Sequence, residues 1–103
     1  MSDFVKVATI SEIPPRSMKS FEVNYTRVLV CNVRGHFYTV ADECSHDSAP
    51  ITDGKLENDQ VVCPRHGARF SVVDGSVLGP PAIVPIDTFN TKIENDNIYI
   101  EVD

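Results

Sequence analysis

Two short motifs of this chain combine cysteine with histidine, and that combination points to metal binding. The first is Cys44–His46 (CSH), and the second, farther along the chain, is Cys63–His66 (CPRH). Thiolates are soft ligands suited to iron–sulfur clusters, zinc or cuprous copper, and imidazole accepts zinc, copper, iron and nickel. The residue types alone therefore predict a metal centre and leave several metals open.

The order of the four residues narrows the choice of metal. Each motif offers one thiolate and one imidazole, so two facing loops can divide the donors by type, with Cys44 and Cys63 on one iron and His46 and His66 on another. This is the ligation of a Rieske [2Fe–2S] centre. Zinc fingers usually pair cysteine with cysteine and histidine with histidine along the chain. The mixed order favours the cluster, and a structural Cys2His2 zinc-binding module stays as an alternative.

The two motifs resemble those of the Rieske-type [2Fe–2S] ferredoxins, the ferredoxin components of bacterial ring-hydroxylating oxygenase systems, and the likeness extends over nearly the whole chain. A third match is Gly79–Pro81 (GPP), which is similar to the proline-containing loop of this family. The resemblance implies one [2Fe–2S] cluster per chain, held by Cys44, His46, Cys63 and His66. It also implies that Pro80 and Pro81 form a lid over the cluster.

The resemblance implies partners as well. A ferredoxin reductase, a flavoprotein that oxidises NAD(P)H, would supply single electrons, and a terminal Rieske oxygenase would receive them. We expect an aromatic ring-hydroxylating dioxygenase, with a monooxygenase system or the small Rieske subunit of an assimilatory nitrite reductase as alternatives. The chain itself is not expected to be an enzyme, because only His36 remains outside the candidate ligands and a mononuclear iron site needs two histidines and a carboxylate.

Four positions differ from the high-potential Rieske proteins of respiratory complexes. Ala49 and Arg65 stand where those proteins have a pair of disulfide-forming cysteines, and Ala68 and Phe70 stand where they have serine and tyrosine hydroxyls. Hydrogen bonds from such hydroxyls to sulfur stabilise the more negative, reduced state. Their loss predicts a low-potential carrier, towards the bottom of a span of roughly −150 to +300 mV.

Charge and composition exclude other functions. The 103 residues include 15 acidic and 9 basic ones, for a formal charge of −6. Nucleic acids and anionic membranes attract Lys and Arg, so we expect neither as a partner, whereas a basic patch on a protein partner would fit. Asp42, Glu43 and Asp47 lie beside the first motif and are candidates for such docking. The first residues do not resemble an export signal, so we expect a cytoplasmic monomer.

The third cysteine has an ordinary explanation. Cys31 lies inside Arg27–Val33, an apolar and β-rich run that is typical of a strand buried on both faces. Free cysteine in such a place behaves as a small hydrophobic residue. We therefore expect neither a third thiolate ligand nor a structural disulfide.

The pattern of apolar residues predicts an all-β chain. One helical turn near Ser11–Ile13 is the only helical element expected. The resemblance implies a single Rieske domain over 1–103, in which an antiparallel β-sandwich base carries a small inserted cluster-binding subdomain at about 41–81. Runs rich in β-formers and separated by turn signals are expected to form strands at 4–8, 21–23, 27–33, 37–41, 60–63, 69–73, 89–93 and 98–102.

Overall fold

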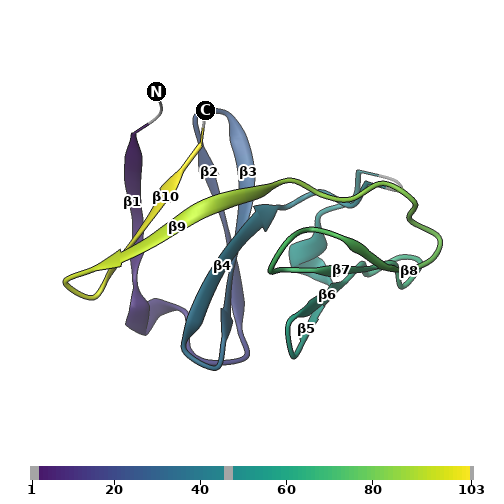
Figure 1. Ribbon diagram of the computed structural model, residues 1–103, viewed down its shortest axis with the longest axis horizontal. Helices are drawn as coiled ribbons and strands as arrows, with labels where there is room; N and C mark the ends of the chain where they lie inside the picture. The colour runs from purple at the N-terminus through teal and green to yellow at the C-terminus, as the bar shows by residue number, and fades with distance from the viewer. Residues whose placement is uncertain (1–2, 46–47, 103) are drawn as a thin grey trace.

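A computed structural model describes residues 3–45 and 48–102. Within these residues it contains two antiparallel sheets and two single-turn 3-10 helices, η1 (Ile10–Glu12) and η2 (Ile51–Asp53), so the chain is all-β as predicted (Figure 1). The strands are β1 (Phe4–Thr9), β2 (Met18–Val23), β3 (Thr26–Val33), β4 (His36–Ala41), β5 (Lys55–Glu57), β6 (Gln60–Val62), β7 (Arg69–Ser71), β8 (Val77–Gly79), β9 (Thr88–Glu94) and β10 (Asn97–Glu101).

The larger sheet forms the base, with strand order β1-β10-β9-β4-β3-β2. Strand β9 joins its two halves, because its first residues pair with β4 and its later residues pair with β10. Two tight turns connect neighbouring strands here. Arg34 and Gly35 turn β3 into β4 with φ of 54° and 91°, and Asn95 and Asp96 turn β9 into β10 with φ of 52° and 64°. Glycine and asparagine favour this left-handed region.

Strand β3 is buried on both faces, as its apolar run predicts. Val28 and Val30 pack into a core shared with β1, β2 and β10, inside the base. Leu29 and Cys31 point to the opposite face and join a second core, which contains both candidate ligand cysteines. Because successive side chains of a strand alternate between faces, this one strand connects the base to the site.

The smaller sheet, β5-β6-β7-β8, is inserted between β4 and β9 and stands to one side of the base (Figure 1). The chain leaves the base at Ala41 and returns at Asp87, where the N–H of Ala41 donates a hydrogen bond to the carbonyl of Asp87 at 2.9 Å. The expected arrangement of a sandwich base with an inserted subdomain is therefore confirmed. No helix in the described ranges has the length and apolar character needed to cross a membrane.

Several short elements differ from the prediction. Strands β5 and β8 and the helical turn η2 were not expected, and β2 begins at Met18 rather than at Phe21. The statement that only one helical turn would form is therefore wrong. In η2, Ile51 is fully buried and the N–H of Gly54 donates to its carbonyl at 2.8 Å. The turn is stabilised by this burial and by hydrogen bonds, and its sequence has no periodic pattern that would predict it.

Candidate functional site

The two cysteine–histidine motifs lie in six-residue loops of the same construction. In the first loop, the N–H of Cys44 donates to the carbonyl of Ala49 at 2.9 Å, and the N–H of Ser48 donates to the carbonyl of Cys44 at 2.8 Å. The second loop, residues 63–68, repeats both hydrogen bonds at the equivalent positions, at 2.8 and 3.1 Å. Each loop therefore places its cysteine at the closed base of the turn.

The fifth residue of each loop has a left-handed conformation. Ser48 has a φ of 62° and Gly67 has a φ of 73°. A Cβ added at Gly67 would meet nothing within 4 Å, so the described protein atoms leave room for a side chain there. The positive φ of Gly67 is by itself a reason for glycine at this position.

Substitutions at Ser48 and Gly67 should differ in their effect on the free energy of unfolding. We expect Gly67→Ala to lower the free energy of unfolding by about 1 kcal/mol, because a Cβ is disfavoured at positive φ. Ser48→Gly relieves the same strain, so it should leave stability unchanged or raise it by about 0.5 kcal/mol, the gain being offset by glycine's unfolded-state entropy. Urea denaturation of both variants measures this difference. Equal losses in both would contradict the proposed equivalence of the loops.

The candidate ligands differ in exposure. Cys44 and Cys63 are 0% and 2% exposed and belong to one hydrophobic core, where neither forms a disulfide. His66 is exposed at the tip of its loop. His46 lies outside the described residues. Within those residues, no group of three or more His, Cys, Asp and Glu side chains that could hold a metal ion occurs.

This distribution fits a mixed sulfur and nitrogen centre. The buried thiols supply soft donors on the inner side, and the exposed imidazole of His66 supplies a nitrogen donor on the outer side. A [2Fe–2S] cluster that takes two thiolates on one iron and two imidazoles on the other needs this separation of donor types. The donor set of the two loops therefore fits the predicted cofactor.

The surroundings of the two cysteines are apolar. Ala68 and Phe70 are both 0% exposed and pack in the same core as Cys44 and Cys63. Neither side chain carries a hydroxyl that could donate to sulfur. None of Cys31, Cys44 and Cys63 forms a disulfide, so no disulfide joins the two loops.

Cys31 is buried, as its strand position predicts. It is 0% exposed in β3. Burial raises the pKa of its thiol to about 12, and the negative charge of Asp42 adds to this shift. A raised pKa and full burial are typical of a cysteine that packs as a small hydrophobic residue.

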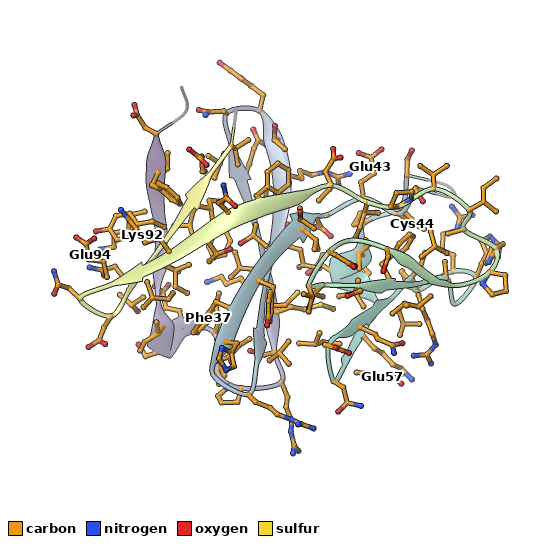
Figure 2. The ribbon with its side chains drawn as sticks, in the orientation of Figure 1. Phe37, Glu43, Cys44, Glu57, Lys92 and Glu94 are labelled. Carbon is orange, nitrogen blue, oxygen red and sulfur yellow. The ribbon has the colours of Figure 1, made fainter. Side chains whose placement is uncertain are left out.

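Asp42 is not the docking residue that its place beside the first motif suggested. It is 1% exposed, and its carboxylate oxygens accept hydrogen bonds from the hydroxyl of Ser20 at 2.7 Å and from the N–H of Thr52 at 2.8 Å. Its neighbour Glu43 is exposed at the surface next to Cys44 (Figure 2). Asp47 lies outside the described residues. Of the three candidates, Glu43 alone is shown to be accessible to a partner.

The segment after β8 lies against the first loop. Pro80 and Pro81 are exposed and joined by a cis peptide bond. Farther along, the hydroxyl of Ser45 donates a hydrogen bond to the carbonyl of Val84. Ser45 and Val84 also line a cavity of about 360 Å³ beside Cys44. The returning chain is therefore held directly to the loop that carries the first cysteine.

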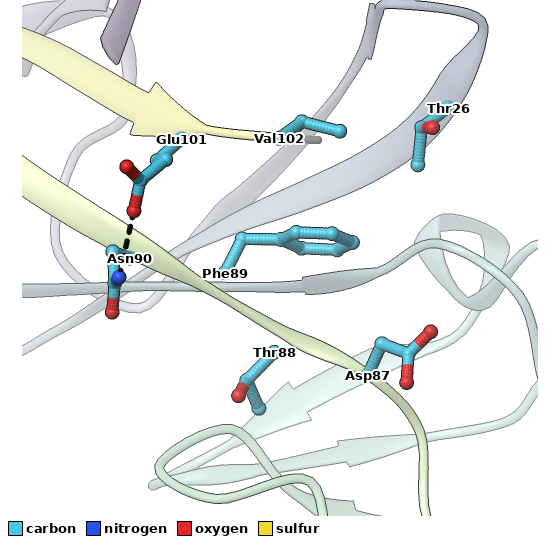
Figure 3. Close-up of a pocket in the computed structure, with 7 residues that line it drawn as sticks. All are labelled: Thr26, Asp87, Thr88, Phe89, Asn90, Glu101 and Val102. Carbon is cyan, nitrogen blue, oxygen red and sulfur yellow. Dashed lines mark hydrogen bonds between the residues drawn. The ribbon is translucent and has the colours of Figure 1, made fainter. Parts of the chain in front are cut away.

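A larger cavity, of about 450 Å³, lies at the edge of the base. Figure 3 shows its lining, which includes Asp87, Phe89 and the hydrogen-bonded pair Asn90 and Glu101, with the amide of Asn90 2.9 Å from the carboxylate. It has neither cysteine nor histidine in its lining. This cavity therefore offers none of the cysteine and histidine donors that the sequence predicts for the metal centre.

Comparison with known proteins gives consistent matches. The family model of the Rieske [2Fe-2S] domain matches residues 3–90. The ferredoxin component of biphenyl 2,3-dioxygenase from Rhodococcus jostii (strain RHA1) is 37% identical over 98 residues, which cover 95% of this chain and 92% of that protein. The ferredoxin component of the naphthalene 1,2-dioxygenase/salicylate 5-hydroxylase systems of a Ralstonia species is 30% identical over 101 residues, covering 98% and 97% of the two chains.

A solved structure agrees with these relatives. A chain in the complex of reduced oxygenase and oxidized ferredoxin in carbazole 1,9a-dioxygenase is similar to this chain, with a TM-score of 0.90 and 28% identity. The alignment covers 95% of this chain and 92% of that one. The similarity therefore includes both the base and the inserted sheet.

Proposed function

This chain belongs to the Rieske [2Fe–2S] domain family, and we propose that it carries single electrons from an NAD(P)H-dependent ferredoxin reductase to a terminal oxygenase. The two curated relatives are ferredoxin components of dioxygenase systems, and the similar structure contains an oxygenase with its ferredoxin. The 37% identity with such a component over 95% of this chain is the observation that carries the proposal. In this role the chain is an electron carrier and transforms no substrate itself.

We assign one [2Fe–2S] cluster per chain to the two loops. Cys44 and Cys63 would hold the inner iron, and His46 and His66 would hold the outer iron. The equivalent backbone hydrogen bonds of the loops, the buried thiols and the exposed His66 support this assignment. When bound, the cluster supplies a one-electron couple.

Exposed residues in and beside the two loops would contact the partner proteins. His66 is exposed, so an iron held by this residue would be on the side of the site that a docked protein can reach. Ile83 and Val84 are 90% and 54% exposed, in the segment held to the first loop. Apolar side chains at the centre of an interface exclude water when a partner binds. Pro80 and Pro81 precede these residues and would cover a third side of the cluster.

The proposed carrier has a low reduction potential. Ala68 and Phe70 are buried beside the cysteines without a hydroxyl to donate, and hydrogen bonds to sulfur are a principal means of raising the potential. Such a carrier accepts electrons from a flavin- or NAD(P)H-linked reductase more readily than from a quinol.

The class of oxygenase that receives the electrons is inferred from the relatives. We propose an aromatic ring-hydroxylating dioxygenase as the electron acceptor, since one curated relative serves biphenyl 2,3-dioxygenase and the other serves naphthalene 1,2-dioxygenase/salicylate 5-hydroxylase systems. The nitrite reductase and zinc-module alternatives are not favoured by these matches. We also propose a single Rieske domain, residues 1–103, that acts as a monomer in the cytoplasm, where free cysteines stay reduced.

The visible spectrum of the purified protein tests the function. We expect a brown protein with two irons and two acid-labile sulfides per chain, which bleaches on reduction at a potential near the low end of the Rieske span, about −150 mV. It should then be reduced by NADH only when a ferredoxin reductase is added. A colourless protein with one zinc per chain would contradict the proposal and make the site a structural clip.

A further inference from the structure

Asp42 is the only charged side chain that is buried within the described residues, and the proposed electron transfer gives it no role so far. It is 1% exposed, and both of its oxygens act as hydrogen-bond acceptors, from the hydroxyl of Ser20 and the N–H of Thr52. An ionised carboxylate has acceptors only, so this arrangement suits the charged form. Neither donor carries a positive charge, and no Lys or Arg pairs with Asp42 within the described residues. Its negative charge is therefore solvated by dipoles and not cancelled.

Asp42 lies close to the inner side of the site. Only one residue separates it from Cys44, and a chain extends by at most about 3.6 Å per residue, so the two Cα atoms are within about 7 Å of each other. The charge of Asp42 contributes to the raised pKa of Cys31, and Cys31 packs in the same hydrophobic core as Cys44 and Cys63. Asp42 therefore lies next to the core that contains the two candidate ligand thiols.

We propose that the buried carboxylate of Asp42 is a charge that lowers the reduction potential of the cluster, in addition to fixing the start of the first loop. Reduction adds one negative charge to the centre, and a nearby anion disfavours that addition. At an effective dielectric constant of about 20, a unit charge roughly 10 Å away changes an equilibrium constant by more than tenfold. This inference rests on the proposed function, since it requires the cluster in the two loops.

The test is Asp42→Asn, which removes the charge and nearly preserves the shape. The introduced amide can accept from the N–H of Thr52 with its oxygen and donate to the hydroxyl of Ser20 with its nitrogen. We expect the cluster to be retained and the equilibrium constant for reduction to rise about tenfold, which is about 59 mV for a one-electron couple. Spectroelectrochemical titration against redox mediators measures it.

Two control variants separate charge from structure. Glu43→Gln removes the same charge from the next residue, which is exposed, so water and salt should limit its effect on the equilibrium constant to about threefold or less. Ser20→Ala deletes one hydrogen bond to Asp42 and keeps the charge. It should lower the melting temperature without raising the potential. If Asp42 had only a structural role, Asp42→Asn would behave like Ser20→Ala, with a lower melting temperature and no higher potential.

The outcomes distinguish this inference from the proposed function. A colourless wild-type protein would overturn both. A brown wild type, with Asp42→Asn at an unchanged potential or shifted no more than Glu43→Gln, would overturn this inference alone. If Asp42→Asn does not hold the cluster, Asp42→Ser provides a second neutral variant that can still accept one hydrogen bond. Failure of both neutral variants to hold the cluster would assign Asp42 a purely structural role and also overturn the inference.

Discussion

Replacing Cys44 with serine will give a protein without the visible absorption of an iron–sulfur centre, whereas replacing Cys31 with alanine will leave that absorption intact. Both cysteines are 0% exposed and share one hydrophobic core, so the two variants differ in ligand role and not in burial. Serine supplies a hard, weakly acidic oxygen in place of a soft thiolate. At the closed base of the first loop, no solvent-exposed donor can replace the lost thiolate.

The measurements are the visible spectrum and the iron and sulfide content of each variant, with far-ultraviolet circular dichroism to establish that the chain is folded. Cys31→Ala should cost roughly 1 kcal/mol of stability through the small cavity left in the core and should keep two irons per chain. An unchanged spectrum in Cys44→Ser, or a lost cluster in Cys31→Ala, would refute the ligand assignment.

Gly54→Ala will destabilise the protein by about 3 kcal/mol, near the upper end of the usual cost of overpacking. A Cβ at this position would lie 1.9 Å from the carbonyl oxygen of Val62 and 3.1 Å from the backbone nitrogen of Pro64. Both neighbours are backbone atoms, so no side chain can rotate away. Val62 ends β6 and immediately precedes Cys63, so the required shift moves the strand that positions the second ligand thiol.

Gly35→Ala is the matched control for this prediction. Gly35 has a φ of 91°, but a Cβ there would meet nothing within 4 Å. Its substitution should cost only about 1 kcal/mol of backbone strain and should not affect the cluster. Chemical denaturation gives both free energies, and reconstitution with iron and sulfide gives cluster occupancy. Similar losses of stability and full occupancy in both variants would show that the close approach at Gly54 is unimportant.

The sequence was most informative where several residues repeat one pattern. The apolar run of β3 predicted a strand buried on both faces, and the structure adds that the alternate residues Val28 and Leu29 belong to two different cores. The β-rich runs at 89–93 and 98–102 predicted two strands, which pair as β9 and β10. The paired cysteine and histidine motifs predicted the family and its cofactor, because the spacing of donors within a loop is a local property of the chain.

Features that depend on distant partners were not predictable in this way. Strands β5 and β8 have three residues each, which is too short for a periodic pattern, and they form by pairing with β6 and β7. The burial of Asp42 depends on Ser20 and Thr52, which are 22 and 10 residues away in sequence. An aspartate next to a polar loop is usually exposed, so only the folded arrangement shows that this one is enclosed.

The hydrogen bond between Ala41 and Asp87 has a consequence for the evolution of the fold. The chain leaves the base and returns to it at adjacent points. The length and loops of the inserted segment between Ala41 and Asp87 can therefore change without altering the pairing of the base strands. Such changes are limited by the surface of the base that the inserted segment covers, formed by Leu29, Cys31 and Val40. Sequence change in the inserted segment is therefore constrained by its packing against this surface and not by chain connectivity.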